Sequence, residues 1–149
     1  QAYAMIAKAE ATFLSRGDNS GTHKKEMSIW DMAGSSPSGG WYTVTNDFMM
    51  ATLKKANGVK GYFMTDSSTW VAGKKGLDNL DVLFRGDPYL VNVYHAVSVP
   101  AGEENADLAR AFIDLVAGEK GQNIIKSYGL QQYGQAMYND ADYASQYDH

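Results

Sequence analysis

The sequence predicts an α/β fold whose sheet is at least partly parallel, in a chain of 149 residues. Short apolar runs alternate with segments of helical periodicity, which is typical of βαβ units. A glycine-containing turn joins one such run, at residues 12–15, directly to a helical pattern at residues 22–33. After Pro100 the alternation gives way to two amphipathic helical patterns. This length allows one domain or, at most, two small lobes.

The first third of the chain predicts helices on both sides of a short strand. In the second helix, Met27, Trp30 and either Met32 or Ala33 are expected to form the buried stripe, because they recur at helical spacing. Gly34 is expected to end this helix. The elements expected here are, in order, helix 2–11, strand 12–15, turn 16–21, helix 22–33 and loop 34–40.

The middle third predicts most of the strands. Its longest strand candidate is YLVNVYHAVSV, which shows partial alternation and ends at Pro100. The sequence DSSTW is a hydroxyl-rich junction, and its serines are expected to cap the turn that follows rather than to line a cleft. The elements expected here are, in order, strand 41–44, helix 47–56, strand 61–65, junction 66–70, apolar run 81–84 and strand 89–99.

The last third predicts two helices and a polar tail. Asn105 or Asp107 is expected to cap the first helix, whose apolar positions include Leu108 and Phe112. The second helix is expected over residues 119–128, and the tyrosine-rich tail beyond it shows no periodicity. Few strand residues lie near these helices, so their apolar faces pack on the first eighty residues or lack a partner lobe.

Composition excludes several classes of function. The chain has no cysteine, which removes disulfides, thiolate metal sites and cysteine nucleophiles. Its net charge of −4 argues against a nucleic-acid-binding surface. Three scattered histidines do not form a zinc motif, so we expect no metal site and no cofactor. The chain starts at QAYAM, and we expect this to be a processed or trimmed end.

The stretch FLSRGDNSGTHKKE concentrates hydrogen-bond donors at the start of a helix. The first turn of a helix has free backbone N–H groups and a positive partial charge, so it favours anions. Ser20 and Thr22 add hydroxyl donors, and Arg16 adds a full positive charge with several donors. Gly17 and Gly21 let the backbone come close to a ligand. The sequence therefore indicates a small-anion site at residues 16–22.

Other interpretations of this stretch fit less well or are less specific. The glycine spacing does not match a nucleotide-binding P-loop or a dinucleotide fingerprint. RGD occurs twice, at 16–18 and 85–87, and as an adhesion tripeptide it is a weak signal. A nucleophilic Ser20 with His23 as its base lacks an orienting carboxylate and a GxSxG elbow. The structural alternative stays open: Ser20 or Thr22 merely caps the helix, and Arg16 pairs with Asp18 at the surface.

The sequence resembles the tungstate-binding proteins of bacterial ABC uptake systems, which have the type II periplasmic binding fold. Several separated segments carry the resemblance, in the same order and spacing, across most of residues 13–129. It implies a two-lobed protein that holds an oxyanion between its lobes. The matching segments are FLSRGDNSGTHKKEMSIW, GGWYTV, MMATLKKANGVKGYFMTDSSTWVA, LDVLFRGDPYLVNVYHAVSV and ADLARAFIDLVAGEKGQNIIKSYG.

The resemblance implies particular ligands for the anion. Arg16 is expected to reach it, and Ser20, Gly21 and Thr22 are expected to supply hydroxyl and backbone donors. Asp18 is expected to brace the arginine or the turn. Tungstate and molybdate are dianions without a proton to donate, so their site needs donors only. A phosphate site often includes a carboxylate that accepts the remaining phosphate proton. Phosphate would therefore gain support if the Asp18 carboxylate faced the ligand.

The resemblance also implies how the chain divides. Residues 1–86 correspond to the second lobe of a mixed-sheet fold and carry the anion motif. Residues 87–100 correspond to the strand that returns to the first lobe, and residues 101–149 to helices and a tail of that lobe. The family's N-terminal lobe segment, with its own hydroxyl ligands, has no counterpart in this sequence. If this chain folds alone, we expect a homodimer that covers the helices.

The function expected from the resemblance is capture of an oxyanion, tungstate or else molybdate, for a membrane ABC permease. No bond is made or broken, so no enzyme activity and no catalytic residue is expected. The location implied is the periplasm or the cell surface of a bacterium. Two alternatives remain at this point. The same fold can act as a sensing or interaction domain for phosphate or another anion without transport. An enzyme using Ser20 would need a carboxylate–histidine pair beside it.

Overall fold

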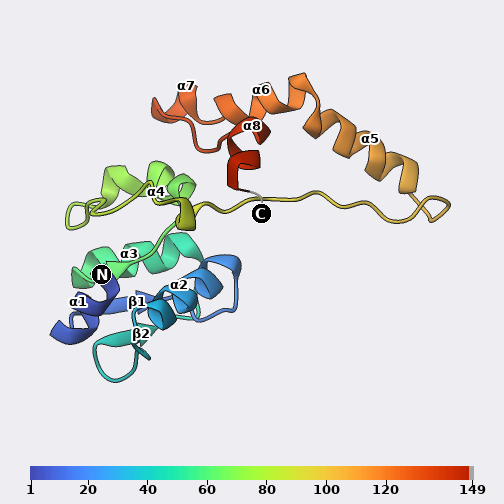
Figure 1. Cartoon of the computed structure of the whole chain (residues 1–149). Coiled ribbons are helices and arrows are strands. Elements are labelled where there is room, and N and C mark those ends of the chain that lie inside the picture. Colours follow the sequence, from blue (N-terminus) through green and yellow to red (C-terminus); the bar gives the residue numbers. More distant parts are fainter. Residues whose placement is uncertain (148–149) are drawn as a thin grey trace. The chain divides into compact units, whose positions relative to one another are not determined.

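The computed structural model describes residues 1–147, which separate into two units. The first unit runs from Gln1 to Leu83 and contains the sheet. The second begins at Phe84 and is helical (Figure 1). His149, one of the three histidines, lies outside the described residues.

The first unit alternates strands and helices in the predicted order, with boundaries shifted by a few residues. Each helix of the unit after the first follows directly on a strand and its loop. Its elements are α1 (Ala2–Ala9), β1 (Phe13–Ser15), α2 (Gly21–Met32), β2 (Tyr42–Val44), α3 (Met49–Val59), β3 (Tyr62–Phe63), α4 (Ser67–Gly73) and the 3₁₀ turn η1 (Lys74–Gly76).

The three strands form one parallel sheet in the order β2-β1-β3. Phe13 in the central strand is level with Tyr42 on one side and Tyr62 on the other. A mixed sheet is expected from the family resemblance, but these strands pair in parallel only. The reason is that α2 joins β1 to β2 and α3 joins β2 to β3, and parallel strands need such crossovers. The predicted α/β class is confirmed.

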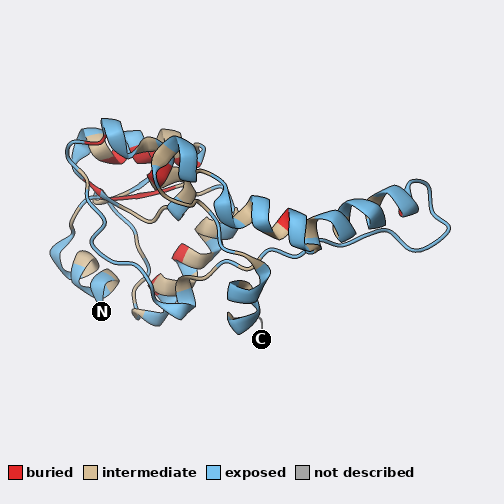
Figure 2. Ribbon diagram, turned by 90° about the horizontal axis from the view of Figure 1, so that it is seen from above, coloured by how far each residue is buried: buried red, intermediate tan, exposed pale blue. Residues whose placement is uncertain are grey.

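An aromatic cluster forms the core beside the central strand. Trp30 is fully buried and Phe13 is 1% exposed. Their ring centroids are 5.1 Å apart with an edge-to-face arrangement, and Tyr3 of α1 lies 4.3 Å from Trp30. Figure 2 shows buried residues gathered on the strands and helices of this unit. The cluster fixes α1 and α2 against the sheet, and α2 begins at the candidate site.

The predicted buried stripe of α2 is wrong in part. Trp30 is buried as expected, but Met27 and Met32 are 39% and 61% exposed. Glu26 takes the buried position instead, with 1% exposure, because it lies four residues before Trp30 on the same helix face. A charged residue at a core position cannot be recognised from apolar periodicity.

In the second unit, the two predicted helices are present, but the predicted strand at residues 89–99 is not formed. Residues 91–99 form no strand, because no described strand lies beside them to complete a hydrogen-bonded ladder. The tail, for which no regular element is expected, contains short helices. The elements of this unit are η2 (Pro88–Leu90), α5 (Ala106–Ala117), α6 (Glu119–Ser127), α7 (Leu130–Tyr133), α8 (Ala141–Ala144) and η3 (Ser145–Tyr147).

Within the second unit, the apolar face of α5 is uncovered. Leu108, Phe112 and Leu115 are 70%, 62% and 53% exposed. The four-residue and three-residue steps between them place all three on one face of the helix. The described residues of the second unit therefore supply no strand that covers this face.

Candidate anion-binding site

The predicted anion motif lies at the carboxyl end of the central strand. Residues 16–20, the β1–α2 loop, lead from β1 directly into the N-terminus of α2. Ligands of open α/β sheets bind outside the carboxyl ends of the strands, where the strand order reverses. In the order β2-β1-β3 that position is beside β1. The motif therefore occupies the place where this topology favours a ligand.

The loop is held in shape by its own backbone conformation and side chains. Gly17 has φ of 68° and Asn19 has φ of 58°, so both lie in the left-handed region. Arg16 Nη2 donates to Asp18 Oδ2, and the Ser20 N–H donates to Asp18 Oδ1 at 3.2 Å. Asp18 thus braces both the arginine and the start of the helix, as expected. The pairing of Arg16 with Asp18 is also what the alternative interpretation predicts, in which these residues only shape the helix start.

The first turn of α2 offers unpaired donors. Ser20 is the N-cap, and its Oγ accepts from the His23 N–H at 3.4 Å. The N–H groups of Gly21 and Thr22, the first two helical residues, have no acceptor among the described residues. The Arg16 side chain is 14% exposed, and its Nε is buried without a hydrogen-bond partner. These groups can all donate to an oxyanion.

Asp18 is ionised at neutral pH. Partial desolvation works to raise the pKa of its carboxyl, but hydrogen bonds from Ser20 and the charge of Arg16 outweigh it and lower that pKa below its usual value. Each carboxylate oxygen already accepts a hydrogen bond within the loop. The carboxylate is therefore engaged with Arg16 and Ser20 inside the loop.

The structure does not assemble a nucleophile at Ser20. The His23 ring accepts at Nδ1 from the Asn19 N–H, at 2.9 Å, and among residues 1–147 no hydrogen bond joins this ring to the Ser20 hydroxyl. The hydroxyl itself is used as a helix cap. The carboxylate–histidine pair that an enzyme interpretation requires beside Ser20 is therefore not formed in the described part of the chain.

The second hydroxyl-rich junction is capped differently from the prediction. Asp66, not a serine, is the N-cap of α4, and it accepts from the Thr69 N–H at 2.7 Å and from Thr69 Oγ1 at 2.8 Å. Ser68 Oγ also donates to this carboxylate. A carboxylate is the stronger acceptor, so the neighbouring hydroxyls turn toward it and act as donors. Ser68 and Thr69 are therefore engaged within the cap.

Replacing Asp66 with alanine is expected to lower the free energy of unfolding by about 1 kcal/mol at pH 7, because a cap is lost. Burial works to raise the pKa of Asp66, but hydrogen bonds from Ser68 and Thr69 outweigh the effect of burial, so the pKa lies below its usual value. A carboxyl with a lowered folded-state pKa stabilises the protein above its unfolded pKa and loses that contribution as pH falls through the folded value. Urea unfolding at pH 7 and pH 3 should show the difference from wild type shrinking at pH 3. Ser67→Ala, in the same turn, is the control.

Gly17 and Gly21 should respond oppositely to a methyl group. A Cβ on Gly17 would lie 2.1 Å from Val44 Cγ1, and its φ is positive, whereas a Cβ on Gly21 would meet nothing within 4 Å. Gly17→Ala is expected to lower the free energy of unfolding by at least about 1–2 kcal/mol from the backbone alone. Gly21→Ala should leave it unchanged or raise it, since alanine favours a helix. Urea unfolding followed by circular dichroism tests both, and equal midpoints would contradict the described loop.

Two functional groups near the site are not apparent from the sequence. Ser15 is fully buried at the end of β1, and Glu26 is buried on α2. Ser15 belongs to an apolar run, and Glu26 interrupts an apolar stripe, so periodicity assigns neither of them to a site. The only signal in the sequence is the four-residue spacing between Glu26 and Trp30, which places a carboxyl on the helix face that Trp30 buries.

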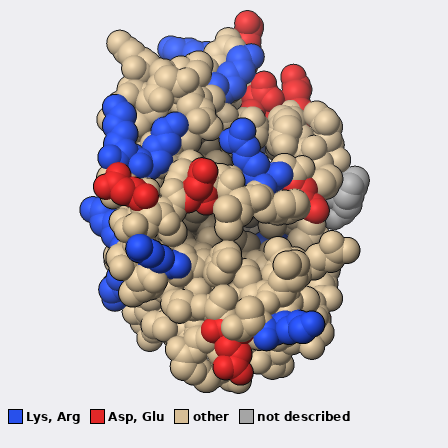
Figure 3. Space-filling view, turned by 90° about the vertical axis from the view of Figure 1, so that its left-hand side faces the viewer, with Lys and Arg blue, Asp and Glu red and all other residues tan. Residues whose placement is uncertain are grey.

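Charge and metal chemistry give little sign of another site. On the face shown in Figure 3, Lys and Arg side chains are interspersed with Asp and Glu. Among residues 1–147, no three His, Cys, Asp or Glu side chains are grouped so that they could hold a metal ion. In the same range, no helix is long and apolar enough to cross a membrane.

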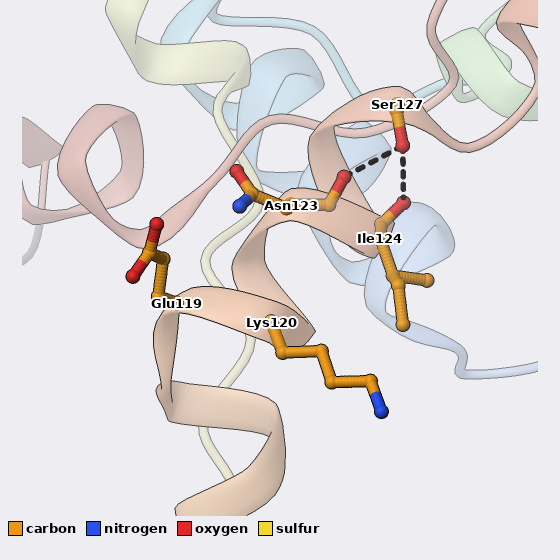
Figure 4. A pocket seen from close by; sticks show the side chains of 5 residues that line it. All are labelled: Glu119, Lys120, Asn123, Ile124 and Ser127. Atoms are coloured by element: carbon orange, nitrogen blue, oxygen red, sulfur yellow. Dashed lines mark hydrogen bonds between the residues drawn. The ribbon is translucent and has the colours of Figure 1, made fainter.

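One described depression is a surface feature of a single helix. It measures about 470 Å³, and Glu119, Lys120, Asn123, Ile124 and Ser127 line it. Figure 4 shows that all five side chains come from α6. Ser127 Oγ donates to the carbonyl oxygens of Asn123, at 2.6 Å, and Ile124, at 3.3 Å. The Ser127 hydroxyl is therefore used within the helix. The polar side chains that line the depression all come from this one helix, so no second element supplies groups that converge on it.

The chain is similar to proteins named for tungstate. It is 36% identical over 136 residues to the tungstate-binding protein TupA of Peptoclostridium acidaminophilum, covering 89% of this chain and 47% of the relative. The crystal structure of the tungstate ABC transporter from Geobacter sulfurreducens matches with a TM-score of 0.69 and 33% identity, covering 86% and 56% of the two chains. The tungstate-binding protein TupA from Desulfovibrio alaskensis G20 matches with a TM-score of 0.66 and 33% identity, covering 91% and 56%.

These similarities agree with the α/β fold. The chain spans about half the length of the curated relatives it matches. Residues 1–120 match the family model described as the PBP superfamily domain. That match covers the whole sheet, the β1–α2 loop and α5. The chain therefore belongs to the PBP superfamily.

Proposed function

We propose that this protein is the solute-binding component of an ABC uptake system and that its ligand is a tetrahedral oxyanion, tungstate first and molybdate second. The observation that carries the proposal is the pair of unpaired N–H groups of Gly21 and Thr22 at the start of α2, directly after the loop that contains Arg16. Donors gathered at a helix N-terminus favour a fully ionised oxyanion. The names of the relatives support tungstate within this class.

The ligands follow from the loop. Arg16 supplies charge, Gly21 and Thr22 supply backbone donors, and the hydroxyls of Ser20 and Thr22 complete the set. Asp18 acts as a brace, since its carboxylate accepts hydrogen bonds from Arg16 and Ser20 within the loop. Binding moves no electrons and breaks no bond, so no enzyme activity and no cofactor are part of the proposal.

The division of the chain is part of the same proposal. Residues 1–86 form the lobe that carries the loop, residues 87–100 lead out of it, and residues 101–149 belong to the opposite lobe. The uncovered face of α5 supports this division, since such a face needs a partner. The partners are then an oxyanion and a membrane permease, and the location is the periplasm or the bacterial cell surface. A second copy of the chain could cover the face instead, which size-exclusion chromatography tests.

The test is calorimetric titration of the product of the complete reading frame with tungstate, molybdate, sulfate and phosphate. Tungstate or molybdate is expected to bind in the micromolar range or tighter, and at least about tenfold tighter than phosphate. The discrimination is expected because phosphate is partly protonated at neutral pH, whereas donors at a helix N-terminus suit a fully ionised dianion. Equal or tighter binding of phosphate would contradict the proposed ligand class and would support a phosphate-sensing role.

A further inference from the structure

A buried carboxyl lies beneath the candidate anion site. Glu26 is 1% exposed, in the second turn of α2, one turn beyond Thr22. Its Oε1 accepts from Trp30 Nε1 at 3.2 Å and from Tyr42 Oη at 2.7 Å. Since Tyr42 belongs to β2, one carboxyl oxygen connects the helix that begins at the site to a strand at the side of the sheet.

Two buried hydroxyl groups lie near this carboxyl but form no hydrogen bond with it. Ser15 Oγ and Tyr3 Oη are both buried and have no hydrogen-bond partner of good geometry among the described residues. Ser15 is nevertheless near enough to lower the pKa of Glu26, and the charge of Glu26 raises the pKa of Tyr3. Ser15 directly precedes Arg16, so the carboxyl lies between the first turns of α2 and the end of β1.

We propose that Glu26 is a positioning residue for the anion site and that it takes up a proton when the anion binds. The hydrogen bond from Tyr42 ties the second turn of α2 to β2, and this tie limits how the N-terminus of α2, with its free N–H groups, can move relative to the sheet that carries Arg16. The proposal rests on the proposed function, because it concerns the same loop. It assigns to Glu26 a role that requires no contact with the anion.

The proton uptake follows from burial and from distance. Four residues of α-helix separate Thr22 from Glu26, a rise of about 6 Å. At that range, a dianion at the helix N-terminus repels an ionised carboxylate that is 1% exposed, and it favours the neutral form of this carboxyl. The proton that the carboxyl binds comes from solvent, and it is released when the anion leaves.

The groups facing Glu26 come from each element packed around it. They are Tyr3 of α1, Ser15 of β1, Tyr42 of β2, and His23 and Trp30 of α2 itself. Burial raises the pKa of Glu26 above its usual value of 4.5, although hydrogen bonds from Tyr42, Ser15 and Trp30 and the charge of His23 work to lower it. If the bound anion raises this pKa further, affinity should increase as pH falls from the anion-bound pKa to the anion-free pKa, and it should level off below the latter.

The experiment measures tungstate binding by the complete reading-frame product between pH 5.5 and pH 8, in buffers of different ionisation enthalpy. Wild type is expected to take up close to one proton per anion in the lower part of this range, with affinity rising up to about tenfold per pH unit. Glu26→Gln keeps an acceptor oxygen for Trp30 and Tyr42, so it should bind without that proton and with a flatter pH profile. Because the ligand is the same, this variant also controls for the protonation of tungstate.

Glu26→Ala tests positioning, because it removes the acceptor as well as the charge. Its affinity is expected to fall at least about tenfold at every pH, while Glu26→Gln restores it. In ¹⁵N-labelled protein without tungstate, the Trp30 indole N–H signal should titrate in wild type and not in Glu26→Gln. This signal reports the carboxyl whether or not tungstate binds.

The outcomes separate the two proposals. If tungstate binds and Glu26→Gln takes up protons as wild type does, proton coupling at Glu26 is overturned. If Glu26→Ala binds as tightly as wild type in a folded protein, its positioning role is overturned. If wild type binds no tungstate, the proposed function is overturned, and the coupling to tungstate is overturned with it. A Trp30 signal that still titrates would show in that case that Glu26 does take up a proton, so the failure would lie in the ligand and not in Glu26.

Discussion

Arg16→Ala is expected to weaken tungstate binding by at least about 30-fold. Arg16 is the only full positive charge in the β1–α2 loop, and its side chain is largely buried at the end of β1. Removing one partner of a desolvated charged contact costs about 2 kcal/mol or more, and 1.4 kcal/mol is a tenfold change in affinity. Calorimetry on the complete reading-frame product measures the change directly.

The sequence supplies a matched control for this prediction. The tripeptide Arg-Gly-Asp occurs again at residues 85–87, where Arg85 is exposed. Arg85→Ala should leave tungstate affinity within about twofold of wild type. Arg16→Lys should lie between Arg16→Ala and wild type, because lysine keeps the charge but not the planar fork of donors. Unchanged affinity in Arg16→Ala would remove this residue from the site and leave only backbone donors.

Trp30→Ala is expected to lower the free energy of unfolding of the first unit by about 3–5 kcal/mol. Trp30 is fully buried, contacts the rings of Tyr3 and Phe13, and donates its indole N–H to Glu26. Its removal leaves a cavity and takes away one of the two hydrogen bonds that the buried carboxyl of Glu26 accepts. Because small domains are stable by only about 5–15 kcal/mol, the variant should be near its unfolding midpoint.

Urea unfolding followed by far-ultraviolet circular dichroism measures this change. Phe48→Ala is the control, since it removes an aromatic ring of the same unit that is 83% exposed. Its free energy of unfolding should stay within about 0.5 kcal/mol of wild type. A Trp30→Ala variant as stable as Phe48→Ala would contradict the aromatic cluster as the core of this unit.

The elements predicted correctly are those with a strong local signal. β1 and β2 are short apolar runs bounded by turn residues, and α2 follows a glycine turn with Ser20 as its cap. In each case the residues that define the element lie within a few positions of one another. The candidate site shares this property, because Arg16 and Thr22 belong to one continuous loop and helix start.

The incorrect predictions concern features that depend on distant residues. YLVNVYHAVSV has the composition of a strand, but a strand forms only where another strand supplies hydrogen bonds, and none lies beside it in the described chain. Met27 has the spacing of a core residue, yet the face that Trp30 buries includes Glu26 instead. At Asp66, the choice between a serine cap and a carboxylate cap depends on how the chain leaves β3.

The sequence by itself determined the α/β class, the order of elements in the first unit and the identity of the loop that carries the donors. These follow from local periodicity, turn residues and helix capping, which act over a few residues. Only the tertiary structure decided that Asp18 engages Arg16 and Ser20, and that Ser15, Glu26 and Tyr42 meet behind the loop. Ser15, Glu26 and Tyr42 come from two strands and a helix. No local pattern specifies their burial, and it is burial that raises the pKa of the Glu26 carboxyl.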